Sequence, residues 1–248
     1  MTTNMPHLYI KGLRLKERLD KNQYYAQIPA IKNLKPLTFK SSLTFFVGEN
    51  GSGKSTLLEA MAVHFGFNPE GGSLNFNFFT KETHSNLFEH LTLVKGVTRP
   101  KDGFFLRAES FYNVATELEK VADVQMLQRS YGGASLHDQS HGESFLNLVN
   151  HRFWGEGLYL LDEPEAALSP QRQLALMVKI KELMDGGSQF IIATHSPILL
   201  AMPGADILSF DKGAISEIQY EETEHFQVTE MVVTRRKTLF KNLFLEVD

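Results

Sequence analysis

The sequence of 248 residues contains no cysteine, which excludes disulfide bonds and thiolate metal sites and fits a reducing compartment. It also has no apolar run long enough to span a bilayer, because the most apolar later stretch, FIIATHSPILLAMPGADIL, is interrupted by polar residues and proline. The first residues, MTTNMPHLYI, lack the apolar core of a secretion signal. We therefore expect a cytoplasmic protein, for which a partner would supply any membrane span.

The sequence also has no excess of positive charge, since it contains 25 Lys and Arg residues and 29 Asp and Glu residues. No overall basic field then attracts nucleic acid or anionic membranes. One local basic cluster near the C-terminus could contact phosphates, although the sequence favours a solvated helical face. Its members are Arg235, Arg236, Lys237 and Lys241.

Alternating strand and helix patterns predict an α/β fold with a mostly parallel sheet flanked by helices. LTFFV (43–47) and GLYLL (157–161) are apolar runs typical of strands buried on both faces, and QFIIA (189–193) is a third. Each is followed or preceded by a helical pattern, such as STLLEAMAVHF and SPQRQLALMVKIKELM. The length fits one domain over residues 1–248.

Three further segments complete the predicted organisation. Residues 71–108 predict a small antiparallel β lobe, and residues 110–153 a mainly helical region. ADILSFD and AISEIQY predict a hairpin around Lys212 and Gly213, followed by a helical tail. Trp154 and the stretch NFNFF are expected to pack in the core or in the lobe rather than to stack on bases.

The segment GENGSGKST fits the phosphate-binding pattern G-x-x-x-x-G-K-[ST] between a predicted strand and a predicted helix. Glycines let successive backbone N–H groups point at phosphate oxygens, lysine supplies a compact cation, and serine offers a hydroxyl to Mg²⁺. The following helix presents its positive end to the anion. The predicted nucleotide-binding residues here are Gly48, Glu49, Asn50, Gly51, Ser52, Gly53, Lys54, Ser55 and Thr56.

Two acids end the apolar run at 158–161. A carboxylate at the carboxyl end of a buried strand faces the crevice where α/β sheets bind ligands. We expect Asp162 to hold Mg²⁺ with Ser55, and Glu163 to polarise the attacking water.

GENGSGKST, LDEPE, AALSP and THS together, in this order and spacing, resemble the ATP-binding-cassette (ABC-type) P-loop ATPases over about residues 8–220. The resemblance implies a P-loop NTPase fold of ABC type with a helical signature region, and ATP and Mg²⁺ as cofactors. His195, 33 residues after Asp162, resembles the family's switch histidine, which contacts the γ phosphate; with Glu163 and Lys54 it is an expected catalytic residue. SHGES resembles a divergent LSGGQ signature, so Ser140 and Gly142 would contact ATP bound to a second copy.

The chain also departs from the family pattern. Glu143 stands for the signature glutamine, and Ser169 for the aspartate that usually follows AAL. Glu109, in RAES, occupies the place of the Q-loop glutamine and is the third expected metal ligand. Tyr24 and Tyr25 are candidates for stacking on adenine, and Tyr25 is the better placed in the sequence.

The segments that depart from the pattern, such as SHGES and RAES, resemble those of stand-alone bacterial ATPases near the repair, chromosome-maintenance and overcoming-lysogenization-defect branches of the family. We expect a soluble ATPase that works as an ATP-dependent homodimer, with a nucleic acid or an effector protein as a further partner. Two alternatives stay open: the ATP-binding subunit of a membrane transporter, and a nucleotide-dependent switch that does not hydrolyse ATP.

Overall fold

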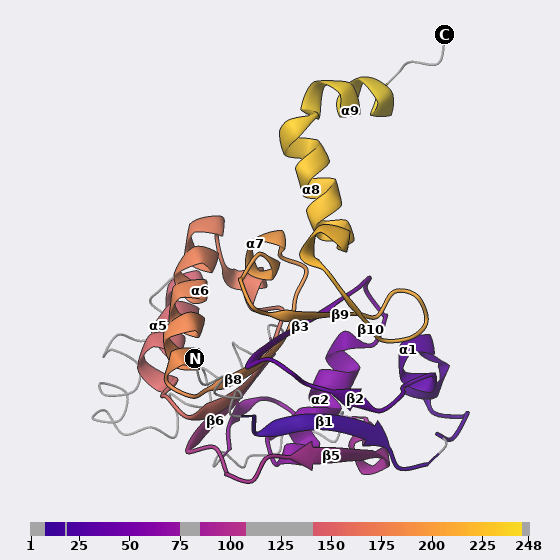
Figure 1. Cartoon of the computed structure of the whole chain (residues 1–248), viewed down its shortest axis with the longest axis vertical. Coiled ribbons are helices and arrows are strands. Elements are labelled where there is room, and N and C mark those ends of the chain that lie inside the picture. The colour runs from indigo at the N-terminus through magenta and orange to yellow at the C-terminus, as the bar shows by residue number, and fades with distance from the viewer. Residues whose placement is uncertain (1–7, 18, 75–84, 108–140, 245–248) are drawn as a thin grey trace, which may run out of the picture.

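The main sheet of the computed structural model has seven strands in the order β10-β9-β3-β8-β7-β6-β4 (Figure 1). The structure describes residues 8–17, 19–74, 85–107 and 141–244. The five central strands are parallel, and β4 and β10 run antiparallel at the two edges. The strands are β3 (Leu43–Val47), β4 (Gly72–Ser73), β6 (Asp102–Arg107), β7 (Gly157–Asp162), β8 (Gln189–Ala193), β9 (Asp206–Ser209) and β10 (Ser216–Ile218).

The predicted α/β class is confirmed, and the reason lies in the apolar runs of the central strands. Every residue of β3, β7 and β8 is buried, so helices or a second sheet must cover both faces.

A second sheet of three antiparallel strands has the order β2-β1-β5. It is made of β1 (Ile10–Leu15), β2 (Leu37–Thr38) and β5 (Leu91–Lys95). The prediction of one β lobe over residues 71–108 is therefore wrong in its grouping, since only β5 of that range belongs to this sheet. β6 is buried along its centre and pairs in parallel with β7, and β4 extends the same edge, because a strand apolar on both faces is stable only inside a covered sheet. Residues 75–84 of that range, which include the stretch NFNFF, lie outside the described residues.

Helices cover both faces of the main sheet. On one face α2 lies between the two sheets, and α5, α6 and α7 pack on the other face (Figure 1). The helical elements are η1 (Tyr24–Gln27), α1 (Pro29–Lys32), α2 (Lys54–Phe65), η2 (Asn86–His90), α5 (His141–Arg152), η3 (Pro164–Ala167), α6 (Pro170–Asp185), α7 (Pro197–Leu200), η4 (Tyr220–Glu222), α8 (Glu224–Thr234) and α9 (Arg236–Leu243).

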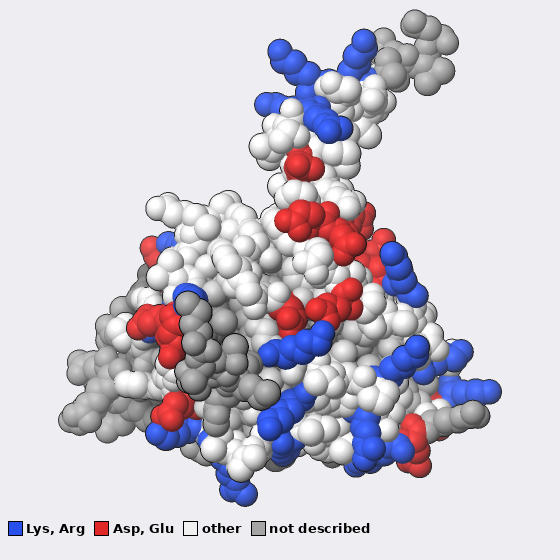
Figure 2. All heavy atoms as spheres, in the orientation of Figure 1, with Lys and Arg blue, Asp and Glu red and all other residues white. Residues whose placement is uncertain are grey.

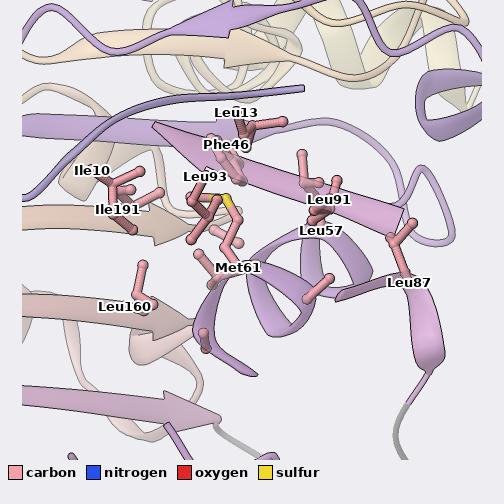
Figure 3. Close-up of a cluster of buried hydrophobic side chains, with 14 of the residues drawn as sticks. Ile10, Leu13, Phe46, Leu57, Met61, Leu87, Leu91, Leu93, Leu160 and Ile191 are labelled. Carbon is pink, nitrogen blue, oxygen red and sulfur yellow. The ribbon is translucent and has the colours of Figure 1, made fainter. Parts of the chain in front are cut away.

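Two apolar cores lie on the two faces, because successive side chains of a strand point in opposite directions. Phe46 joins the core around α2, whereas Phe45 and Val47 join the core under α5 and α6. Figure 3 shows Leu57 and Met61 of α2 between side chains of both sheets. These contacts fix the start of α2, and with it the end of the glycine-rich turn.

The side chain of Gln189 joins the two sheets. Its Oε1 accepts hydrogen bonds from the backbone N–H groups of Tyr9 and Ile10, at 2.8 and 2.9 Å, and its Nε2 donates to the carbonyl of Ile10. The amide is fully buried, so it satisfies three backbone groups that water cannot reach.

The predicted C-terminal hairpin is confirmed as β9 and β10, and the tail after it is helical. We call α8 and α9 the C-terminal arm, because they project from the rest of the molecule (Figure 1). Figure 2 shows basic side chains at the tip of the arm, where Arg235, Arg236, Lys237 and Lys241 are exposed, and acidic ones at its base.

Two smaller findings concern the surface. Trp154 is 62% exposed, so the prediction that it packs in the core is wrong. Its backbone N–H donates a hydrogen bond to the hydroxyl oxygen of Tyr159. None of the helices in the described ranges has the length and apolar character needed to cross a membrane.

Candidate functional site

The glycine-rich turn links β3 to α2 and needs glycine for two separate reasons. Gly48, Gly51 and Gly53 all have positive φ angles, between 79° and 143°, which L side chains rarely adopt. At Gly48 a Cβ atom would also lie 2.7 Å from a carboxylate oxygen of Asp211, and at Gly53 it would lie 2.9 Å from Ile28. The local backbone is thus of the kind that wraps closely around an anion.

Lys54 is the first residue of α2 and is 4% exposed. Its Nζ donates to the carbonyl oxygens of Gly48 and Glu49, at 2.7 and 2.9 Å. Burial lowers the pKa of Lys54, while the nearby acids Glu163 and Asp211 oppose that shift. A buried ammonium held over the turn is suited to meet phosphate oxygens.

Ser55 and Asp162 lie together, as the sequence predicts. The hydroxyl of Ser55 donates to Oδ1 of Asp162 over 2.9 Å. Burial raises the pKa of Asp162 to about 6, against the hydrogen bond from Ser55 and the positive charge of Arg107, which is its register partner on β6. The hydroxyl of Ser55 and the buried carboxylate of Asp162 are hard oxygen ligands, which fit Mg²⁺. This ion binds through few protein ligands, and waters and phosphates fill its other coordination positions.

Glu163 has left-handed backbone angles, with φ 49° and ψ 51°, which are uncommon for a residue other than glycine. Its N–H donates to the carbonyl of Ala193 at the end of β8, so the adjacent strand holds this conformation. The carboxylate is part-exposed, and its Oε1 lies 3.7 Å from Nε2 of His195. Backbone strain of this kind concentrates at functional sites, where the fold holds a side chain in place.

His195 follows β8 and is held from two sides. Its backbone N–H donates to Oε1 of Glu165, and its ring Nδ1 lies 3.0 Å from Nε2 of His225 on α8. Burial lowers the pKa of His195, and the charge of Lys54 adds to this effect. Nε2 of His195 is buried and has no hydrogen-bond partner among the described residues. This nitrogen lies beside Glu163 and is free to hydrogen-bond to a ligand that binds there.

Asp211 supports the turn from behind. Its Oδ1 accepts a hydrogen bond from the backbone N–H of Glu49 at 2.7 Å, and the hydroxyl of Ser209 donates to its Oδ2. Because β9 pairs in parallel with β3, the residues after both strands lie side by side. ADILSFD ends in this aspartate after a buried strand, but that pattern does not show that the side chain reaches the glycine-rich turn.

A pocket of about 370 Å³ opens over the turn. Its wall includes Tyr24 and Ile28 on one side, the turn from Asn50 to Thr56, and Glu163. Tyr24 is 59% exposed and is therefore available to stack on a planar ring.

The choice of Tyr25 for adenine stacking is wrong. Its side chain is fully buried and its hydroxyl donates to Oδ1 of Asn86. The two tyrosines are adjacent in η1, and only the packing of that turn against the core decides which ring faces outward.

Three predicted residues of the signature and metal sites stay predictions. Ser140 and Glu109 lie outside the described residues. Gly142 is in the first turn of α5, where it is buried, and a Cβ there would lie 2.6 Å from the carbonyl oxygen of Ala167. Gly142 thus allows α5 to pack closely against the segment after Glu163.

The structure brings Lys54, Ser55, Asp162, Glu163 and His195 to one edge of the main sheet. Sequence reasoning missed Glu165 and His225 as partners of His195, and Asp211 as support for the turn. Glu165 belongs to the quoted LDEPE segment, whereas nothing in the sequence around His225 places it near β8.

Comparisons with known proteins agree with these motifs. Residues 23–123 match a family described as "AAA domain", and residues 134–201 match one described as "AAA domain, putative AbiEii toxin, Type IV TA system". An uncharacterized ABC transporter ATP-binding protein of Haemophilus influenzae is 26% identical over 70% of this chain and 71% of that protein. A putative ABC transporter ATP-binding protein of Caldanaerobacter subterraneus is 28% identical over 71% of this chain and 79% of that protein. Among solved structures, cbiO1 from Clostridium perfringens aligns with a TM-score of 0.48 and 17% identity, over 93% of this chain and 97% of that one.

Proposed function

The chain is an ABC-type P-loop ATPase domain, and on this premise we propose that it binds ATP with Mg²⁺ and hydrolyses it at a site completed by a second copy. The observation that carries the proposal is the convergence of Lys54, Ser55, Asp162, Glu163 and His195 at one edge of the sheet.

ATP binds with its phosphates in the turn from Gly48 to Thr56. Lys54 exchanges its bonds to the carbonyls of Gly48 and Glu49 for bonds to phosphate oxygens. The adenine ring stacks on Tyr24, the exposed aromatic ring of the pocket wall.

Ser55 and Asp162 are the residues that would hold Mg²⁺, which would supply positive charge to offset that of the phosphates. Glu163 orients and polarises the water that attacks the γ phosphate, and its strained backbone keeps the carboxylate over the turn. His195 donates to the γ phosphate through Nε2, the buried atom left without a partner. Catalysis then consists mainly of positioning and charge stabilisation.

The second copy supplies Ser140 and Gly142, by resemblance to the signature of ABC-type ATPases. Two such sites form in a closed two-fold dimer that ATP holds together and hydrolysis releases.

For the task coupled to hydrolysis, we favour a stand-alone ATPase that works with a nucleic acid or an effector protein in the cytoplasm. The match of residues 134–201 to a family described as a putative toxin of a toxin–antitoxin system supports this proposal. The second candidate is the ATP-binding subunit of a transporter, which the names of the curated relatives favour.

The test is steady-state ATP hydrolysis by the purified protein with Mg²⁺, at several protein concentrations, beside Glu163→Gln. We expect the rate per copy to rise with protein concentration, and to fall about 100-fold or more in Glu163→Gln with nucleotide binding retained. Gln171→Leu, on the exposed face of α6, is the control and should match the wild type.

Different outcomes separate the candidates. ATP binding with no hydrolysis in the wild type would favour the nucleotide-dependent switch. Stimulation by DNA would favour the nucleic-acid task, and copurification with a membrane protein would favour the transporter subunit.

A further inference from the structure

His225 lies at the base of the C-terminal arm and touches the catalytic site. It is the second residue of α8, and its Nε2 is 3.0 Å from Nδ1 of His195. The ring centroids are 5.2 Å apart with planes 57° apart, so the two rings meet by their nitrogen edges rather than by stacking.

The 3.0 Å separation of these two nitrogens is a hydrogen-bond distance, so one of them donates to the other. Burial lowers the pKa of both histidines, and the charge of Lys54 acts on both in the same direction. Two neutral imidazoles at 3.0 Å make one hydrogen bond, in which one nitrogen donates and the other accepts. The tautomer of His195 is therefore fixed by which of the two rings donates.

The surroundings of His195 decide the direction. Its Nε2 faces Oε1 of Glu163 at 3.7 Å, and a carboxylate favours a hydrogen on the nitrogen that faces it. An unprotonated Nε2 would instead turn its lone pair toward an acidic oxygen and toward a phosphate. The other charged groups that act on the pair are Lys54, Asp211 and Glu224.

We propose that His225 is a positioning residue whose Nε2–H donates to Nδ1 of His195 and thereby keeps a hydrogen on Nε2, the atom that faces the γ phosphate. The inference rests on the proposed function for the role of His195, and it adds a residue outside the sequence motifs to the site.

The base of the arm is tied to the same segment by a second contact. The hydroxyl of Tyr220 donates to the carbonyl of Pro197 at 2.8 Å, and its ring packs on Phe226 of α8. Thr223 caps α8 by accepting a hydrogen bond from the N–H of Phe226. These contacts hold the first turn of α8 against the residues after β8, and they thereby fix the position of His225 beside His195.

The direct test reads the tautomer of His195 by ¹⁵N–¹H correlation NMR of the neutral ring, with its signals assigned by their loss in His195→Gln. We expect the wild type to carry its ring hydrogen on Nε2. His225→Leu removes the donor while keeping an apolar side chain, and we expect a mixture of both tautomers. His225→Gln places an amide N–H at a similar reach and should restore the Nε2–H form. His151→Gln, on an exposed histidine of α5, should leave the signals of His195 unchanged.

Kinetics supply a second readout. We expect His225→Leu to lower kcat for ATP about tenfold or more with KM changed less than threefold, and His225→Gln to recover most of that loss. A His195 ring with its hydrogen on Nδ1 in the wild type would overturn the proposal, as would an unchanged tautomer in His225→Leu. Because the NMR readout needs no turnover, a protein that does not hydrolyse ATP would contradict the proposed function without touching this result.

Discussion

Asp162 is a buried carboxylate at the candidate site, and its burial lowers the free energy of unfolding at neutral pH. Burial raises its pKa from 3.8 to about 6, so the folded protein holds its proton more tightly than the unfolded chain does. Between these two pKa values the free energy of unfolding falls as the pH rises, and above pH 6 the full cost is present. A shift of about 2 pKa units corresponds to about 3 kcal/mol.

We therefore predict that Asp162→Asn stabilises the protein without nucleotide or Mg²⁺ in a pH-dependent way. The gain in the free energy of unfolding over the wild type should increase by about 3 kcal/mol between pH 3 and pH 7.5. Urea denaturation at a series of pH values measures it.

Asp20→Asn makes the same change of charge at an exposed position and should follow the wild type. A gain for Asp162→Asn that does not vary with pH would contradict the assigned burial of this carboxylate.

At the same scale, the two tyrosines show the limit of a sequence argument. The glycine-rich segment is recognised from fixed spacing within one short stretch, and in the structure it forms a turn with positive-φ glycines at the start of α2; its binding of phosphate stays a prediction. The distance of Tyr24 and Tyr25 from that segment along the chain says nothing about which ring is buried. Packing of η1 against the core buries Tyr25 and leaves Tyr24 in the pocket wall.

At the scale of elements, the two sheets are joined through one buried amide. Gln189 of β8 makes three hydrogen bonds to the backbone of Tyr9 and Ile10, where the chain enters β1. Each buried backbone group left without a partner costs about 1–3 kcal/mol.

We predict that Gln189→Leu lowers the free energy of unfolding by about 3 kcal/mol or more, although leucine is apolar and similar in size to glutamine. Denaturation in urea measures the loss. Gln171→Leu, the same change at an exposed site, should stay within about 0.5 kcal/mol of the wild type. A loss below 1 kcal/mol for Gln189→Leu would mean that β1 is held by its apolar contacts alone.

The grouping of strands was the other question at this scale. Local patterns predicted one antiparallel lobe over residues 71–108, yet β5 and β6, which both lie in that range, enter different sheets. Strand existence depends on the side chains of the strand itself, whereas the choice of partner depends on which distant surface buries them. The pairing of β1 with β5 joins segments about 80 residues apart, which no local pattern encodes.

At the scale of the whole molecule, the proposed function places a second copy against the site. Glu163 lines the pocket over the turn, and His195 lies beside it with Nε2 3.7 Å from Oε1 of Glu163; in the proposed function a second copy supplies a further wall. Oligomeric state should then depend on the nucleotide.

We predict that Glu163→Gln with ATP and Mg²⁺ changes from a particle of 28.1 kDa to one of twice that mass, because bound ATP that is not hydrolysed joins the two copies. Size-exclusion chromatography with light scattering measures the mass. Lys54→Ala, which removes the cation for the phosphates, should stay monomeric under the same conditions. A Glu163→Gln protein that binds ATP and remains a monomer would contradict the composite site.

The glycine-rich turn, the acids after β7, the histidine after β8 and the parallel α/β class could all be predicted from the sequence, because each depends on residue types at short spacing within one strand–turn–helix unit. No local pattern predicted that Tyr24 rather than Tyr25 lines the pocket, that β5 and β6 enter different sheets, or that Asp211 and His225 reach the site. These depend on contacts between segments distant in the chain, where burial and pairing are set by the fold as a whole.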